Sequence, residues 1–396
     1  MRSRTYVIIG IALALVLGAV IATQVQRARK TAELLDDLDT DASDVATDTM
    51  QELRKRGHRV EDQLIERTRS SRRKERMRAA LLLGEVGTQK SGPALVGLLE
   101  DEWPPVRRAA VWALGKIAYQ PAVSNLLAIV GDEKAEMDTR CLAVQSLSLL
   151  CMSGLDEADR RLCVPPMVTI MERRPKLTEE QLTTLRETKA KAKAEREAAK
   201  RGEVLEEEAA EAKPAETKAA EEEIPAEPVP ADTEIELRGE AVLLLGLTEA
   251  AEALKPLLHS ADEEVEPAPL VRQHACMALG DLPEVPTDDV NAGLMGHALL
   301  NALEDTDATV RMFAARALAR HPSFGKVNAG VDTSANERLA EMAEELTSLG
   351  EPAYWVREAA RTACDARHVP YQTERAEKTE AAPPEKVVRP VSTGGK

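Results

Sequence analysis

The chain has 396 residues and a net charge of −16, with 43% hydrophobic but only 2% aromatic residues. Such acidity argues against a general nucleic-acid binder, which needs a basic face to neutralise phosphates. The apolar residues are mostly Ala, Leu and Val, which are typical of helix packing rather than of sheets. The five cysteines are scattered and odd in number, so they indicate no disulfide framework.

Residues 1–30 are predicted to be a membrane anchor or a signal segment. Tyr6 to Ala22 carries no charge, and as a helix it would span about 26 Å, just short of a roughly 30 Å hydrocarbon core. An uncleaved anchor is favoured over a cleaved secretory signal in which Val20 and Ala22 precede the cut. Basic residues lie on both sides of the segment, so orientation is poorly determined, and the short preceding tail slightly favours an exported body over a cytoplasmic one. Residues 31–58, rich in Asp, are predicted to be an acidic spacer.

A short pattern then recurs seven times, each time with Arg as its second residue. VRRAAVWALG at Val106 and VRMFAARALA at Val310 are two copies. The recurring arginines, which we call the arginine ladder, are Arg76, Arg107, Arg140, Arg238, Arg272, Arg311 and Arg357. Their steps are 31, 33, 98, 34, 39 and 46 residues. The pattern indicates two blocks of repeats, 59–172 and 235–368.

Each copy is preceded by another apolar stretch that is expected to be helical, so the predicted unit is helix, turn, helix. In LLNALEDTDATVRMFAARAL, Asp305 and Asp307 are placed to cap the helix that carries Arg311. The Gly that closes several copies is expected to end the second helix in a left-handed conformation. These closing residues are Gly84, Gly115, Gly246 and Gly280.

This recurring LLxDxDxxVRxxAxxALG unit resembles HEAT repeats, in the short form also found in phycobilisome lyase proteins. The resemblance implies an all-α fold, a HEAT-like α-solenoid of about seven two-helix repeats in which stacked pairs share one core. Ser148, Ala319 and Asp365 depart from the pattern where it closes with Gly. Most steps are also shorter than the roughly 40–47 residues of long HEAT units.

Residues 173–234 form a charged, low-complexity insert within the fourth unit. Its first half, 173–201, has ten Lys and Arg against five Glu, and is rich in helix formers without an apolar stripe. Its second half, 202–233, has two Lys against eleven acidic residues and is predicted to be disordered, as is the tail 369–396. The insert is either a solvated loop or an interaction arm whose basic half contacts acidic protein or lipid headgroups.

The sequence shows no phosphate-binding loop, no HExxH and no GxSxG motif, and no catalytic, cofactor or metal residue is assigned. Cys276 occupies the position of Val in other copies and is predicted to be a core residue. Cys151 and Cys163 flank a short loop and can come close, although structural thiols are the favoured interpretation.

Two hypotheses cover the ladder: each Arg pairs with acidic residues of the preceding turn or the neighbouring unit, or the aligned side chains bind phosphate or carboxylate groups. The first is favoured. Trp103, Tyr354 and Trp355 precede ladder residues and either bind a partner or cover the edge of the stack.

We therefore expect a non-enzymatic, membrane-tethered HEAT-repeat scaffold that binds a protein partner, with no cofactor and no nucleic acid. The alternatives are a lyase-type enzyme or its accessory subunit, which requires a pocket with a nucleophile or His, and a cell-envelope structural spacer.

Overall fold

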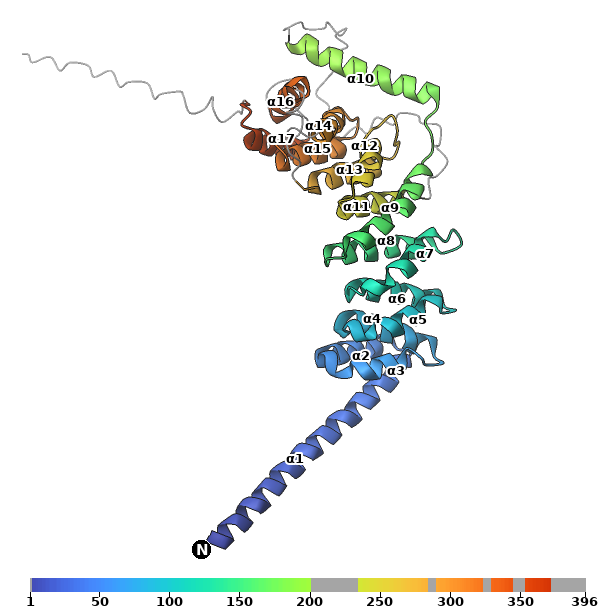
Figure 1. Cartoon of the computed structure of the whole chain (residues 1–396), viewed down its shortest axis with the longest axis vertical. Coiled ribbons are helices and arrows are strands. Elements are labelled where there is room, and N and C mark those ends of the chain that lie inside the picture. Colours follow the sequence, from blue (N-terminus) through green and yellow to red (C-terminus); the bar gives the residue numbers. More distant parts are fainter. Residues whose placement is uncertain (1, 201–233, 284–289, 323–328, 345–352, 372–396) are drawn as a thin grey trace, which may run out of the picture. The chain divides into compact units, whose positions relative to one another are not determined.

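The computed structural model describes the backbone of residues 2–200, 234–283, 290–322, 329–344 and 353–371. Within these residues every regular element is a helix, as predicted (Figure 1). The chain divides into two compact units, Met1–Glu172 with Glu236–Ala253 and Arg173–Ile235 with Leu254–Lys396. Each unit is described by itself. The predicted disordered segments 202–233 and, for the most part, 369–396 lie outside the described residues.

The first unit alternates the two kinds of helix that the sequence predicts. The helices that carry the ladder are α4 (Arg73–Val86), α6 (Pro104–Lys116), α8 (Met137–Met152) and α11 (Ile235–Thr248). The intervening ones are α3 (Glu61–Arg67), α5 (Gly92–Gly97), α7 (Val123–Gly131) and α9 (Glu157–Glu172). Because α4 packs on α6 and α6 on α8, successive ladder helices lie side by side (Figure 1).

The second unit repeats this arrangement and adds the helix of the insert. Its ladder helices α13 (Pro269–Asp281), α15 (Ala308–Arg320) and α17 (Tyr354–Arg367) pack successively on one another. The intervening helices are α12 (Ala251–Ser260), which begins at the end of the first unit, α14 (Val290–Ala302) and α16 (Ala329–Ala343). The insert contributes α10 (Glu179–Lys200).

The helix starts follow from local chemistry. The side chain of Asp307 accepts hydrogen bonds from the backbone nitrogens of Thr309 (2.8 Å) and Val310 (3.0 Å), so the predicted cap of α15 is confirmed. Helix α6 instead begins with two prolines directly after Trp103, where a missing N–H leaves no helical hydrogen bond unmade.

The closing glycines do not cap their helices, so that prediction is wrong. Gly84, Gly115, Gly246 and Gly280 all lie inside helices, and none has a positive φ. A Cβ added to Gly115 would lie 2.9 Å from the Cα of Ser146 on α8. One on Gly84 would lie 2.9 Å from the Cα of Ala113 on α6, and Gly280 meets α15 in the same way. The repeated Gly therefore permits close approach of consecutive ladder helices.

In three repeats a residue with left-handed backbone conformation lies three residues after the closing position of the pattern. Ala118, Glu249 and His368 have φ values of 53°, 53° and 58°. The backbone nitrogen of Tyr119 donates to the carbonyl of Leu114 at 3.1 Å, which closes the last turn of α6. These helices thus end with an unfavourable left-handed residue that is not Gly.

Residues 31–58 are not a spacer, and that prediction is also wrong. Helix α1 (Arg2–Asp36) continues into this segment, and α2 (Ser43–Arg56) packs against α4. Leu35, Leu38 and Leu53 are buried there. A few well-spaced leucines are sufficient for packing, although Asp and other polar residues between them hide the pattern.

No helix in the described part of the chain is long and apolar enough to cross a membrane. The predicted membrane segment therefore gains no support here. Most of its apolar run falls on residues 6–16, whose side chains lie outside the described ones.

The insert separates α11 from α9 in sequence, yet α11 packs in the first unit. Gln145 Nε2 donates to Glu240 Oε1 at 2.9 Å, and Arg160 pairs with Glu249 at 3.2 Å. The predicted second block, 235–368, is consequently divided between the two units.

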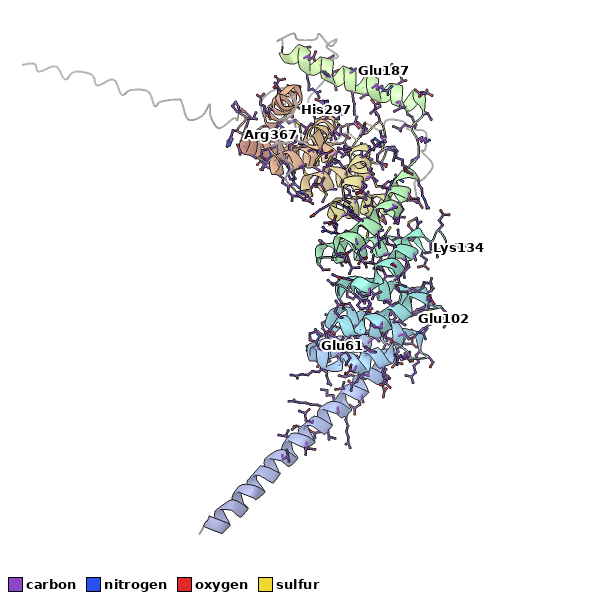
Figure 2. All side chains as sticks on the ribbon, in the orientation of Figure 1. Glu61, Glu102, Lys134, Glu187, His297 and Arg367 are labelled. Atoms are coloured by element: carbon purple, nitrogen blue, oxygen red, sulfur yellow. The ribbon has the colours of Figure 1, made fainter. Side chains whose placement is uncertain are left out.

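Polar side chains also link neighbouring repeats. Glu61, at the start of α3, is buried and accepts hydrogen bonds from the backbone and hydroxyl of Thr88 and from Ser91 Oγ, at 2.6–2.9 Å (Figure 2). Burial alone would raise the pKa of Glu61, but these donors hold it below its ordinary value.

Candidate functional site

The ladder arginines of the first unit contact the turn ahead of their own helix and the turn of the next repeat. Arg76 donates from Nε and Nη2 to the carboxylate of Asp101 at 2.6 and 3.0 Å, and from Nη1 to the carbonyl of Ser70 at 2.9 Å. Arg107 of the next repeat donates to the carbonyls of Asp101 (2.8 Å) and Glu102 (3.3 Å). The Asp101 turn is therefore fixed from two helices.

These contacts keep Asp101 ionised although it is largely buried. Burial raises the pKa of a carboxyl group, but the hydrogen bonds from Arg76 and from the backbone nitrogen of Trp103 hold the Asp101 pKa below its ordinary value. Hydrogen bonding to Asp101 in turn raises the pKa of Arg76.

The second unit repeats this geometry. Arg272 donates to both carboxylate oxygens of Asp305 at 2.8 and 2.9 Å, and to the carbonyls of Glu266 and Pro267 at 2.9 Å. Arg311 then donates to the carbonyl of Asp305 at 2.7 Å. Asp305 accepts from the backbone nitrogen of Asp307 as well, so this buried carboxylate is fully engaged.

The other ladder arginines are also buried or in contact with neighbouring groups. Arg140 is buried and donates from Nε to the carbonyl of Val130 at 3.0 Å. Arg238 is fully buried, and the guanidinium of Arg357 lies 5.9 Å from the ring centroid of Tyr354. The role of the ladder stays a prediction, and these contacts support a structural role over a basic strip open to ligands.

The three aromatic candidates differ in exposure. Trp103 is half-buried, with the guanidinium of Arg73 4.9 Å from its ring centroid. Tyr354 and Trp355 are the first residues of α17 and are 62% and 44% exposed. Only this pair on α17 offers an accessible aromatic surface of the kind that protein interfaces favour.

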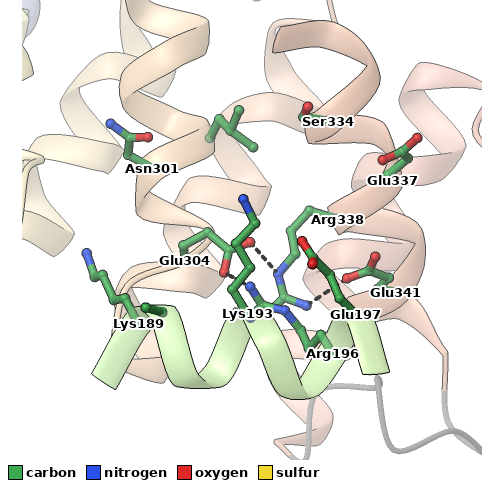
Figure 3. A pocket seen from close by; sticks show the side chains of 12 residues that line it. Lys189, Lys193, Arg196, Glu197, Asn301, Glu304, Ser334, Glu337, Arg338 and Glu341 are labelled. Carbon is green, nitrogen blue, oxygen red and sulfur yellow. Dashed lines mark hydrogen bonds and ion pairs between the residues drawn. The ribbon is translucent and has the colours of Figure 1, made fainter. Parts of the chain in front are cut away.

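A charged cavity of about 500 Å³ lies within the second unit, between α10 on one side and α14 and α16 on the other (Figure 3). Its charged lining residues are Lys189, Lys193, Arg196 and Glu197 of α10, Glu304 after α14, and Glu337, Arg338 and Glu341 of α16. Figure 3 shows Lys193 and Arg196 reaching from α10 toward Glu304 and Arg338.

Arg338 is the most buried charge of this cavity. Its guanidinium lies 3.3 Å from Glu304 and 3.3 Å from Glu341, while Arg196 pairs with the same Glu304. Burial lowers the pKa of Arg338, and the neighbouring Arg196 acts in the same direction. Charges of both signs alternate across the cavity, and its described lining includes the hydroxyl of Ser334 but no Cys or His.

The cysteines form no disulfide and no metal site among the described residues. All five are buried and free. Cys151 and Cys163 do come close, as the sequence indicates, because their thiols are in hydrogen-bonding contact. Burial raises the pKa of Cys141 to about 11, so its thiolate is disfavoured. No group of three metal-ligating side chains occurs among the described residues.

The repeat geometry agrees with a comparison of families. Residues 61–148 match the family model of HEAT repeats. The match covers the helices α3 to α8, in which the ladder contacts of Arg76 and Arg107 occur. No curated protein matches the chain.

Several solved structures are similar to the chain at low sequence identity. Human deoxyhypusine hydroxylase in complex with glycerol is 18% identical, over 89% of this chain and 99% of its own, at a TM-score of 0.29. The complex of CpcE and CpcF of phycocyanin lyase from Nostoc is 20% identical, over 77% and 94%, at 0.36. A designed armadillo repeat protein in complex with the peptide (KR)4 is 15% identical, over 85% and 98%, at 0.31. At these scores none of them carries an argument about this chain.

The cavity and its charges are absent from the sequence prediction. The spacing of Arg186, Lys189, Lys193 and Arg196 is visible in the insert. Glu264, the partner of Arg186, however, lies 78 residues away, and no local pattern connects the two.

Proposed function

We propose that the chain is a non-enzymatic HEAT-repeat scaffold that binds a protein partner through its second unit. The observation that carries this proposal is the adjacent pair Tyr354 and Trp355, exposed at the start of the last ladder helix. The whole chain has only three Trp, four Tyr and two Phe, so two adjacent exposed aromatics are unusual in this composition. Aromatic side chains contribute large contact areas at low entropic cost, and they are enriched among the residues that dominate binding energy.

The ladder supports the same conclusion. Its side chains are committed to turns and to neighbouring repeats, so the repeated residues build the surface. The residues that differ between copies then supply the specificity. Trp355 is such a residue, because the equivalent position in α13, two residues before the ladder Arg, is Leu270.

We further propose that the uncharged run Tyr6–Ala22 tethers the scaffold to a membrane, with the body on the exported side. A reporter enzyme fused after residue 396, active only outside the cytoplasm, tests the side. Extraction of membranes with alkaline carbonate tests the tether.

Site-specific photo-crosslinking in the native cells tests the scaffold. A photoreactive phenylalanine at position 355 is expected to give one dominant protein adduct. The same residue at position 270, which is 37% exposed in the wild type, is the matched control and is expected to give none. Equal labelling from both positions, or none from position 355, contradicts the proposal. A small-molecule ligand panel that shifts the melting temperature would instead favour the enzyme alternative.

A further inference from the structure

The helix of the insert carries a stripe of basic side chains. Arg186, Lys189, Lys193 and Arg196 follow one another at steps of three, four and three residues along α10. At 3.6 residues per turn, this spacing places all of them on one face of the helix. We call this set the basic stripe.

The basic stripe faces carboxylates of its own unit. Arg186 Nη2 lies 2.7 Å from Glu264 Oε2, and Lys189 Nζ lies 2.7 Å from Glu263 Oε2. Arg196 pairs with Glu304. Glu337 and Glu341 line the same cavity, and we call these carboxylates (Glu263, Glu264, Glu304, Glu337 and Glu341) the acidic face.

The attachment of α10 is electrostatic rather than a packed core. Among its described side chains only Ala198 is buried. A cavity of about 500 Å³ separates α10 from α14 and α16, whereas packed protein interiors contain few voids larger than a water molecule. Hydrogen bonding to Arg186 lowers the pKa of Glu264, which is half-buried. Leu182 and Leu185 are half-buried, so release of the helix uncovers only these few apolar side chains together with Ala198.

We propose that the acidic face is a docking site for a basic helix of a partner protein, and that α10 occupies it as an intramolecular competitor. The partner helix presents Lys or Arg at the same three, four, three spacing as the basic stripe. Because α10 is covalently linked to the unit, its effective concentration is about millimolar, and a free helix must overcome this competition. The inference rests on the proposed function in one respect, that the partner is a protein.

Peptide binding to the full-length chain tests this competition. The probe is a fluorescein-labelled peptide with the sequence of residues 179–200, and the readout is fluorescence anisotropy at low ionic strength. The variant R186E/R196E weakens the attachment of α10 and leaves the acidic face intact. It is expected to bind the peptide about ten-fold more tightly than the wild type does. Faster amide hydrogen exchange in α10 of this variant is the independent sign of release.

Matched variants separate charge from position. K176E/K191E changes the net charge equally but lies off the basic stripe, and it is expected to bind the peptide as the wild type does. Adding E264K/E337K to R186E/R196E is expected to abolish binding. Both carboxylates are accessible, unlike Glu263, which also contacts the buried Arg272, so this change leaves the fold intact. Equal peptide affinity of wild type and R186E/R196E overturns the inference, as does binding that survives E264K/E337K.

A membrane surface is the competing ligand for the basic stripe. E264K/E337K alone removes the Arg186–Glu264 pair and places positive charge opposite a wild-type α10, which weakens its attachment. The decisive result combines two measurements: this variant binds phosphatidylserine vesicles more tightly than the wild type does, and R186E/R196E binds no peptide. In that case the arm is a lipid-binding element, and the inference fails. The crosslinking result at position 355 is independent of these outcomes, so failure of the acidic face and failure of the scaffold are distinguishable.

Discussion

Replacing the repeated Gly by Ala is expected to destabilise the stack, although Ala is the better helix former. The gain in helix propensity from Gly to Ala is about 0.5–1 kcal/mol. In G115A, however, the new Cβ would lie 2.8 Å from the Cβ and 2.9 Å from the Cα of Ser146, and a backbone atom cannot rotate away. Overpacking of this kind costs about 1–3 kcal/mol. We expect a net loss of about 1–2 kcal/mol in the free energy of unfolding.

Urea unfolding of the full chain, followed by far-ultraviolet circular dichroism, measures this change. Gly97 is the matched control, because a Cβ there meets nothing within 4 Å, and G97A is expected to stabilise the chain. The swap G115A/S146G returns space to α8. It is expected to recover part of the loss, with a coupling energy of at least about 0.5 kcal/mol. A G115A protein as stable as the wild type would refute the close-approach explanation and reopen the capping one.

Three further predictions concern other parts of the fold. D101A leaves the guanidinium of Arg76 without its bidentate partner in a largely buried position, and we expect a loss of about 3 kcal/mol in urea unfolding. The carboxyls of Asp101 and Glu61 have lowered pKa values, so their stabilisation is complete above the unfolded-state pKa of about 4 and is lost as pH falls through the folded value. The urea midpoint should fall on acidification, and less steeply in D101A. A118G removes a left-handed residue that is not Gly and should raise the melting temperature, whereas an unchanged or lower value would contradict the strain.

Much of the fold could be predicted because the repeat makes each signal appear several times. The ladder and the helical pairs recur in register, and the structure contains both, whereas the side-chain cap at Asp307 is particular to α15 among the ladder helices with a described N-cap. The closing Gly recurs equally clearly, yet its role was assigned wrongly. A sequence pattern shows that Gly recurs at the position of Gly115 in several copies, but not whether φ or the neighbouring Ser146 favours it.

The charged arm illustrates a different limit. The helix formers of α10 are local and predict a helix, and its basic stripe has a regular spacing. Its partners are distant in sequence: Arg196 and Glu304 are separated by 108 residues. Electrostatic pairing across such distances leaves no periodic signal, so the low-complexity composition favoured a solvated loop.

Burial distinguishes the two sets of arginine–carboxylate pairs in this protein. Arg272 and Asp305 are 2% and 1% exposed at their side chains, and removing Asp305 would leave the buried Arg272 with the longer contact to Glu263, at 3.4 Å, in place of its bidentate partner. Arg186 and Glu264 are 58% and 35% exposed, so water and salt compete for both partners and the pair contributes little by itself. The same chemistry therefore gives a permanent contact between repeats and a reversible contact at the arm. Since reversible contacts are the ones that a partner can replace, the proposed competition for the acidic face is expected at the charged arm rather than in the ladder.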